Sequence, residues 1–206
     1  MVLFAEKLDS ENIAFWEEKI IETKNGRSII LFAKKIKNAN VKKLEDVIIN
    51  LGIAKYIYEF AVNVPNANIK RLGRVLLELK DVEYITYFTM NFNINIPEAQ
   101  DVIIESKNPK YICLFAEYVV GADINILEDT IISIGDARFI FEFAIKVQNA
   151  NITKLLQTFI KNVNKEDYDL INDFADELDR ENLQLLKETF PEAFIIKIPI
   201  RTRTKI

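Results

Sequence analysis

The chain of 206 residues is half apolar and 28% charged, a composition typical of a folded globular protein or of a short repeat array. It contains no histidine and one cysteine, which excludes Ser-His-Asp and Cys-His catalysis, His-ligated metals and a disulfide within the chain. The formal net charge is −4, and the five glycines and five prolines favour an all-α protein with short connections.

The first residues, Met1–Ser10, lack the basic segment and apolar run of a signal peptide, so we expect none there. The chain has no uninterrupted apolar run of about 18 residues, so we expect no membrane span. A lone cysteine suits a reducing compartment, and we therefore expect a cytoplasmic protein.

A recurring Phe-Ala pair marks an internal repeat. It stands at Phe4-Ala5, Phe32-Ala33, Phe60-Ala61, Phe115-Ala116, Phe143-Ala144 and Phe174-Ala175, and Phe88-Thr89 completes the series. The successive spacings are 28, 28, 28, 27, 28 and 31 residues. An isoleucine precedes the Phe by three positions (Ile29, Ile57, Ile85, Ile112, Ile140 and Ile171), and an apolar residue follows it by four. This spacing is one apolar stripe of an α-helix, which predicts a helix around residues 29–36 and its equivalents.

A second helix is predicted after each of these. An Asn or Asp, followed by an aliphatic residue, stands eight residues after most of the Phe residues: Asn12-Ile13, Asn40-Val41, Asn68-Ile69, Asp123-Ile124, Asn151-Ile152 and Asn182-Leu183. In the fourth unit the pair is Asn95-Ile96, one residue earlier, with Pro97 next. These side chains are expected helix N-caps, and the stripe Val41, Leu44, Ile48 continues into the second helix.

Each unit is therefore expected to be a helical hairpin of about ten plus eleven residues. Neither helix buries its stripe alone, so neighbouring units must stack. We predict an all-α fold, an α-solenoid of about seven 28-residue helix-turn-helix repeats, forming one domain over residues 1–190. The alternative, a globular helical bundle, would not need such strict periodicity. Residues 191–206 are expected to form a C-terminal tail, extended from Ile196 onward, where apolar and polar residues alternate.

Over roughly residues 2–190 the chain resembles short tandem helical-hairpin repeat proteins, broadly HEAT-like or TPR-like, of bacterial and phage type and unassigned function. Its period is shorter than theirs, and their signature residues do not occur here. The resemblance implies an α-solenoid fold and a role as a small adaptor or inhibitor, for instance a phage-type protein that occludes a host defence enzyme.

No catalytic constellation is recognised. The carboxylate clusters at Glu128-Asp129 and at Glu166, Asp167 and Asp169 are of the kind that binds Mg²⁺ or moves protons, but the pattern places them on solvent faces or loops. We expect no enzyme activity, no metal and no cofactor. Cys113 is expected to pack as a small hydrophobic residue.

Charge is unevenly distributed along the chain. Residues 19–80 carry thirteen basic against five acidic side chains, a net +8, whereas residues 81–137 carry two against ten, a net −8. Lys42, Lys43, Lys70 and Arg71 fall in the first turn of the second helix of two successive units, where cations and backbone N–H groups suit an anionic ligand.

These features support two hypotheses. The first is a protein-interaction module with a basic N-terminal half and an acidic middle, whose opposed charge blocks also suit self-association. The alternative is nucleic-acid binding through the basic units, with Tyr58 for stacking. The candidate binding residues are Lys34, Lys35, Lys42, Lys43, Lys70, Arg71, Arg74 and Tyr58, with Asp101, Asp123, Glu128 and Asp129 in the acidic part.

Overall fold

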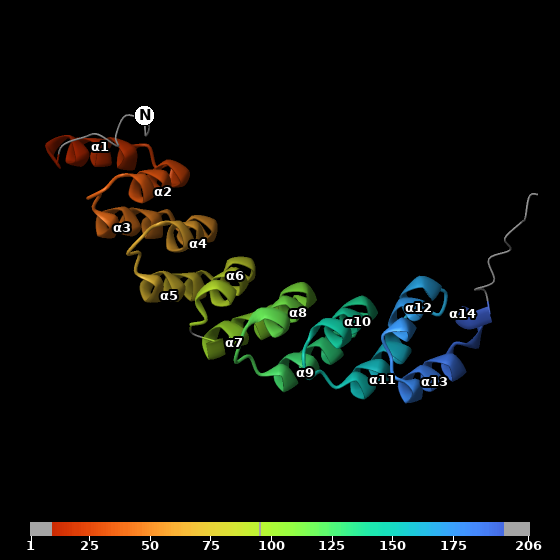
Figure 1. Cartoon of the computed structure of the whole chain (residues 1–206). Coiled ribbons are helices and arrows are strands. Elements are labelled where there is room, and N and C mark those ends of the chain that lie inside the picture. The colour runs from red at the N-terminus through yellow and green to blue at the C-terminus, as the bar shows by residue number, and fades with distance from the viewer. Residues whose placement is uncertain (1–9, 95, 196–206) are drawn as a thin grey trace, which may run out of the picture. The chain divides into compact units, whose positions relative to one another are not determined.

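A computed structural model of the chain describes residues 10–94 and 96–195. Every regular element in these ranges is a helix, and the fourteen helices pack in neighbouring pairs (Figure 1). They are α1 (Ser10–Glu22), α2 (Gly26–Lys35), α3 (Val41–Leu51), α4 (Ala54–Asn63), α5 (Ile69–Leu79), α6 (Val82–Phe92), α7 (Ile96–Ser106), α8 (Pro109–Tyr118), α9 (Ile124–Ile134), α10 (Ala137–Lys146), α11 (Ile152–Asn162), α12 (Tyr168–Asp176), α13 (Arg180–Thr189) and α14 (Pro191–Ile195).

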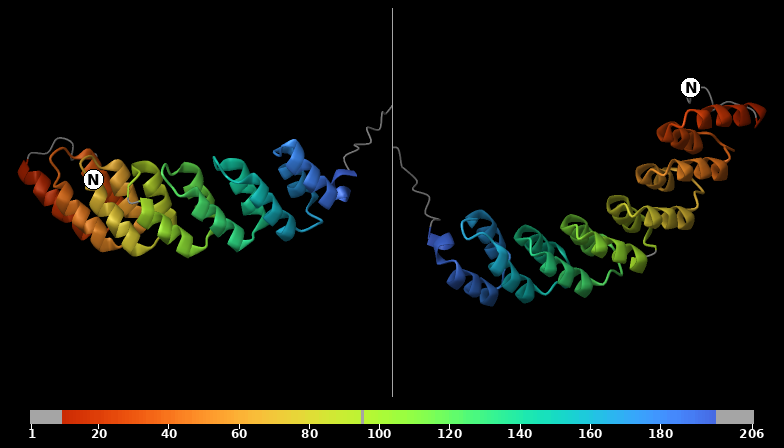
Figure 2. Two further views of the ribbon diagram at one scale, coloured as in Figure 1. Left: turned by 90° about the horizontal axis from the view of Figure 1, so that it is seen from below. Right: turned by 180° about the vertical axis from the view of Figure 1, so that it is seen from behind.

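The chain divides into two compact units. The first contains α1 to α7 and the short segment 118–122, and the second contains α8 up to residue 117 together with α9 to α14. In the first unit α2 contacts α4 and α4 contacts α6, while α1, α3, α5 and α7 lie in a second layer (Figures 1 and 2). In the second unit α10 packs between α9 and α11, and α14 packs on α12 and α13.

The predicted apolar stripe forms the core of both units. The isoleucine and phenylalanine residues of the repeat, from Ile29 and Phe32 to Ile171 and Phe174, are at most 3% exposed. Because each stripe is buried against the neighbouring helices, the periodic pattern and the observed packing agree. The predicted caps are confirmed at Asn40, Asn68, Asp123 and Asn151, whose side chains accept from first-turn N–H groups.

Two predicted caps are wrong. Asn12 lies inside α1, and Asn182 lies inside α13, where it is 8% exposed and Asp179 caps the helix instead. Asn95 lies outside the described residues. At α13 the helix start shifts by one turn, because the nearby Asp179 can take the capping position.

The predicted tail is also shorter than expected. Residues 191–195 form α14, and Ala193 is 2% exposed against the end of the second unit. Asn172 of α12 donates a hydrogen bond to the carbonyl of Ala193 at 3.3 Å. Pro191 begins this helix, a position in which its missing N–H costs nothing. The expected extended segment from Ile196 onward lies outside the described residues.

Candidate interaction surface

A buried glutamate recurs on α1, α3 and α9, and we call Glu17, Glu45 and Glu128 the latch glutamates. They are 5%, 3% and 3% exposed. Each accepts a hydrogen bond from the backbone N–H of the asparagine that caps the equivalent helix of the next hairpin, at 2.5 Å for Asn40 and at 2.7 Å for Asn68 and Asn151. A charge-assisted bond to an otherwise unsatisfied N–H therefore joins successive hairpins.

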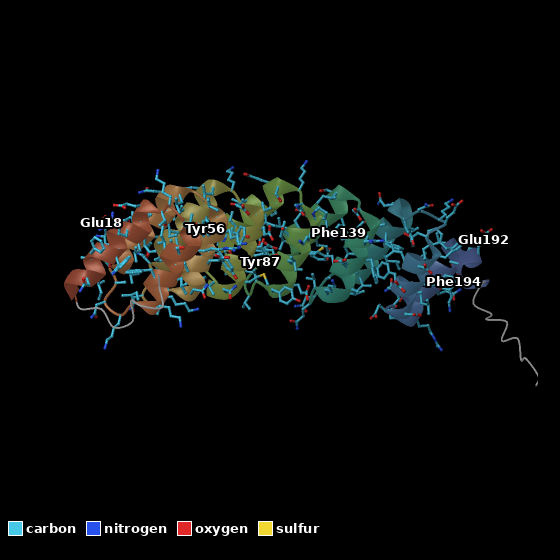
Figure 3. The ribbon with its side chains drawn as sticks, turned by 90° about the horizontal axis from the view of Figure 1, so that it is seen from above. Glu18, Tyr56, Tyr87, Phe139, Glu192 and Phe194 are labelled. Atoms are coloured by element: carbon cyan, nitrogen blue, oxygen red, sulfur yellow. The ribbon has the colours of Figure 1, made fainter. Side chains whose placement is uncertain are left out.

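An ion pair lies beside each of these bonds. The residue after the latch glutamate pairs with a cation in the first turn of the next hairpin's second helix, as Glu18–Lys43, Asp46–Arg71 and Asp129–Lys154. Arg71 also contacts Glu45, and Lys154 contacts Glu128, each at 3.2 Å. The hydrogen bond with Asp46 raises the pKa of Arg71, and the one with Asp129 raises the pKa of Lys154. Glu18, labelled in Figure 3, is the exposed partner on α1.

This pairing gives Lys43 and Arg71 a role other than the predicted contact with an anionic ligand. The Lys43 and Arg71 amides already donate to the cap oxygens of Asn40 and Asn68, each at 3.1 Å. Their side chains are directed to carboxylates of the preceding hairpin, which would repel a phosphate. Lys43 and Arg71 thus serve contacts between hairpins.

Three acidic candidates are likewise part of the scaffold. Glu128, which the pattern placed on a solvent face, is buried, so that placement is wrong. Asp129 pairs with Lys154, as described above. Asp123 is exposed and caps α9 through bonds from Asn125 and Ile126 at 3.1 and 3.3 Å. Of the acidic candidates, Asp101 remains as an exposed side chain on α7 for which the structure gives no ion pair in the described part of the chain.

The step from α5 to α7 departs from the latch pattern. Gly73 occupies the position equivalent to Glu45, and a Cβ there would lie 2.7 Å from the ring of Phe88, so a larger residue does not fit. The charges of the neighbouring pair are also exchanged, because Arg74 stands where Asp46 stands and Glu98 where Arg71 stands. Lys70, Arg74 and Glu98 line one surface depression here with Leu77 and Ile94.

The exposed cations that remain form the candidate surface. Lys35, Lys42, Lys70 and Arg74 are exposed, and no ion pair is given for them within residues 10–94 and 96–195. Lys34 donates to the side-chain oxygen of Asn63 at 2.9 Å and so bridges α2 and α4 without losing its charge. Lys42 lines a depression beside the cluster of Glu45, Asp46 and Arg71. The structure therefore separates the basic candidates into paired and unpaired sets.

Tyr58 is less available than the sequence suggested. It is half-buried, its ring lies 5.8 Å from that of Tyr84 and 6.1 Å from that of Tyr87, and its hydroxyl accepts from Asn91 at 3.1 Å. The three rings join α4 to α6, and Tyr87 is labelled in Figure 3. These contacts give Tyr58, Tyr84 and Tyr87 a role in packing α4 against α6.

Cys113 packs as predicted and is 4% exposed. Burial, with a smaller contribution from Glu142, raises its pKa to about 12, so the thiol stays protonated at neutral pH. In the ranges that the structure describes, acidic and cysteine side chains form no group of three or more able to hold a metal ion. None of the described helices has the length and apolar character needed to cross a bilayer.

The latch was not recognised in the sequence, although a signal exists. An acidic dipeptide begins at Glu17, Glu45 and Glu128, and in each case an asparagine follows 23 residues later and a cation 26 residues later. Each of these features was visible on its own as a cap or a surface charge. Only their joint spacing identifies a contact between hairpins.

The chain was compared with protein-family models, with curated proteins and with solved structures, and no match was obtained in any of the three comparisons.

Proposed function

We propose that this protein is a non-catalytic interaction module of adaptor or inhibitor type, built as an α-solenoid of about seven 28-residue hairpins. The recurrence of the latch supports the repeat, because the same bond and ion pair join hairpins at three steps and occur in both units. Repeats of this kind present long helix faces whose residues vary while the packing residues recur.

The charge left after internal pairing carries the proposal. Several exposed charged side chains on α2, α3 and α5 form no ion pair within the described residues. They are Arg27, Lys34, Lys35, Lys42, Lys70 and Arg74, with Glu78 as the one carboxylate among them. Leu31 on α2 and Val62 on α4 are 43% and 47% exposed. On α2 the cations flank the exposed Leu31. A cationic surface with exposed apolar side chains suits a protein partner with an acidic surface, because charge orients the partner while apolar contact supplies affinity.

The test uses the triple variant Lys42→Glu, Lys70→Glu, Arg74→Glu. Captured partners from the native host are identified by mass spectrometry, purified and titrated against each form of the chain. Three exposed pairs of about 0.5 kcal/mol each correspond to an affinity loss of roughly tenfold. The matched control is Lys110→Glu, Lys161→Glu, Lys165→Glu, which changes three exposed lysines of the second unit. Equal affinity in the triple variant and the wild type would contradict the proposal.

Nucleic acid is the competing partner, and the same variants test whether the protein binds it. Labelled single- and double-stranded RNA and DNA are titrated at low and near-physiological salt, since phosphate contacts are strongest at low salt. We expect no binding that depends on Lys42, Lys70 and Arg74. Salt-sensitive binding lost in that triple variant would replace the proposed function with nucleic-acid binding.

A further inference from the structure

The helices α2 and α12 carry opposite charges at equivalent positions. Both contain the Phe-Ala pair, and their core residues correspond with an offset of 142 residues, Ile29 to Ile171 and Phe32 to Phe174. At the same offset Arg27 corresponds to Asp169, Lys34 to Asp176 and Lys35 to Glu177. Leu31 and Asp173 are the fourth pair of positions and differ in polarity instead.

These positions form one exposed face on each helix. Spacings of four, seven and eight residues place them on the side opposite the buried stripe, and all eight side chains are exposed. No ion pair is given for any of their seven charges in the part of the chain that the structure describes. On α4 and α10, by contrast, charge is neutralised within the helix, through Lys55–Glu59 at 3.9 Å and Glu142–Lys146 at 3.4 Å.

Although Asp169 suits the first turn of α12, the other charges of its acidic face are unfavourable for an isolated helix. Asp169 and Asp173, and Asp173 and Glu177, are like charges at i,i+4, which repel across one turn. Asp176 ends the helix and Glu177 follows it, where the helix dipole favours cations. A cationic cover would relieve both effects, and the exposed face of α2 offers cations with the same spacing.

We propose that the exposed face of α12 in one copy of the chain docks, antiparallel, on the exposed face of α2 in a second copy. This arrangement brings Arg27 opposite Asp176 and Glu177, and Lys34 and Lys35 opposite Asp169. The inference names one partner for the proposed interaction module and rests on that function. Because the two faces differ, the contact is heterologous, and a chain of copies or a closed ring can form through it.

The first measurement is the molar mass of the purified full chain by light scattering over a range of concentrations. At about 0.01 M ionic strength, where the Debye length is ~30 Å, the mass should rise with concentration above the 23.9 kDa of one chain. At about 1 M, where the Debye length is ~3 Å, it should fall to that of one chain. The mass of a single chain at every concentration and both salt levels would overturn the inference.

Charge reversal then tests which helices meet. The variant Arg27→Glu, Lys34→Glu, Lys35→Glu and the variant Asp169→Lys, Asp176→Lys, Glu177→Lys should each associate roughly tenfold or more weakly than the wild type. An equimolar mixture should associate again, because the reversed α2 of one variant then matches the reversed α12 of the other. A mixture that stays at the mass of one chain would contradict this pairing.

The matched control is the Lys110→Glu, Lys161→Glu, Lys165→Glu variant, which lowers the net charge by the same amount as the α2 variant and changes none of the eight face positions. It should associate like the wild type, and an equal loss in this control would show that net charge alone governs the mass. All substituted side chains are exposed, and thermal unfolding of each variant checks that the fold is kept. If the chain stays a single copy while the purified acidic partner still binds, this inference fails and the proposed function stands.

Discussion

Glu45 illustrates at the scale of one residue how a charge can be buried without a large penalty. Its side chain is 3% exposed, but one oxygen accepts from the Asn68 amide and the other lies 3.2 Å from Arg71. A buried charge is tolerated when it is paired and hydrogen-bonded. The residue therefore links two hairpins, whereas the adjacent Asp46 is 44% exposed and adds a contact at the surface.

The two neighbours give a matched pair for a stability test. We expect Glu45→Ala to lower the free energy of unfolding by about 1–3 kcal/mol, because the Asn68 amide loses its acceptor. Asp46→Ala should cost less than about 1 kcal/mol, as for an exposed ion pair. Urea unfolding followed by circular dichroism measures both. An Asp46→Ala loss as large as that of Glu45→Ala would show that the latch is not the stronger contact.

Because of Cys113, the free energy of unfolding should depend on pH in the alkaline range. Its pKa is about 12 in the folded chain, above the ordinary value of 9.0, so the folded state holds a proton that the unfolded state loses first. The stabilisation of the folded state by the protonated thiol is fully present below pH 9. It is lost as pH rises toward 12, by about 1.4 kcal/mol per pH unit.

Two readouts check this prediction. Urea unfolding at pH 8, 9 and 10 should show a steeper fall for the wild type than for Cys113→Ala. At pH 8 a thiol reagent should modify native protein far more slowly than unfolded protein, since the thiolate fraction is roughly a thousandfold lower. Equal labelling rates in native and unfolded protein would show that the thiol is accessible.

At the scale of elements, the close approach of α2 and α4 depends on Gly26. It is buried at the start of α2, and a Cβ there would lie 2.3 Å from Cδ2 and 2.6 Å from Cγ of Tyr56. Tyr56, labelled in Figure 3, therefore fills the space that a side chain would take. The same layer contact is made elsewhere by other residues, so this glycine is a local solution to packing.

We expect Gly26→Ala to lower the free energy of unfolding by about 1–3 kcal/mol, because the tyrosine ring must move. In a Tyr56→Ala background the same change should cost nothing or stabilise by up to about 1 kcal/mol, since alanine is the better helix former. A double-mutant cycle from thermal or urea unfolding measures the coupling. Additive effects of the two substitutions would exclude this contact as the cause.

At the scale of the whole molecule, the net charge of −4 conceals two separate uses of charge. Some of the basic residues between positions 19 and 80, such as Lys43 and Arg71, form ion pairs between hairpins. The basic residues of α2 (Arg27, Lys34 and Lys35) are exposed and form none of these pairs, and they correspond in position to acidic residues of α12. Counting charges along the sequence does not separate these sets, because pairing depends on which helices are neighbours.

The core was predictable because it is periodic. The isoleucine and phenylalanine stripe and the caps at Asn40, Asn68, Asp123 and Asn151 follow from local rules of helix formation, which need no long-range information. The cap at Asn182 was wrong because Asp179, three residues earlier, takes the capping position after the longer 31-residue step, and the cap at Asn12 was wrong because α1 already begins at Ser10.

The sequence by itself determined that the chain is all-α and which face of each helix is apolar, because helix period and capping are local properties. The tertiary structure decided which charged residues are available. Glu128 is buried and Arg71 paired because their partners lie on the next hairpin, more than twenty residues away. The charged side chains on the exposed faces of α2 and α12 stay available, because they form no ion pair within the described residues.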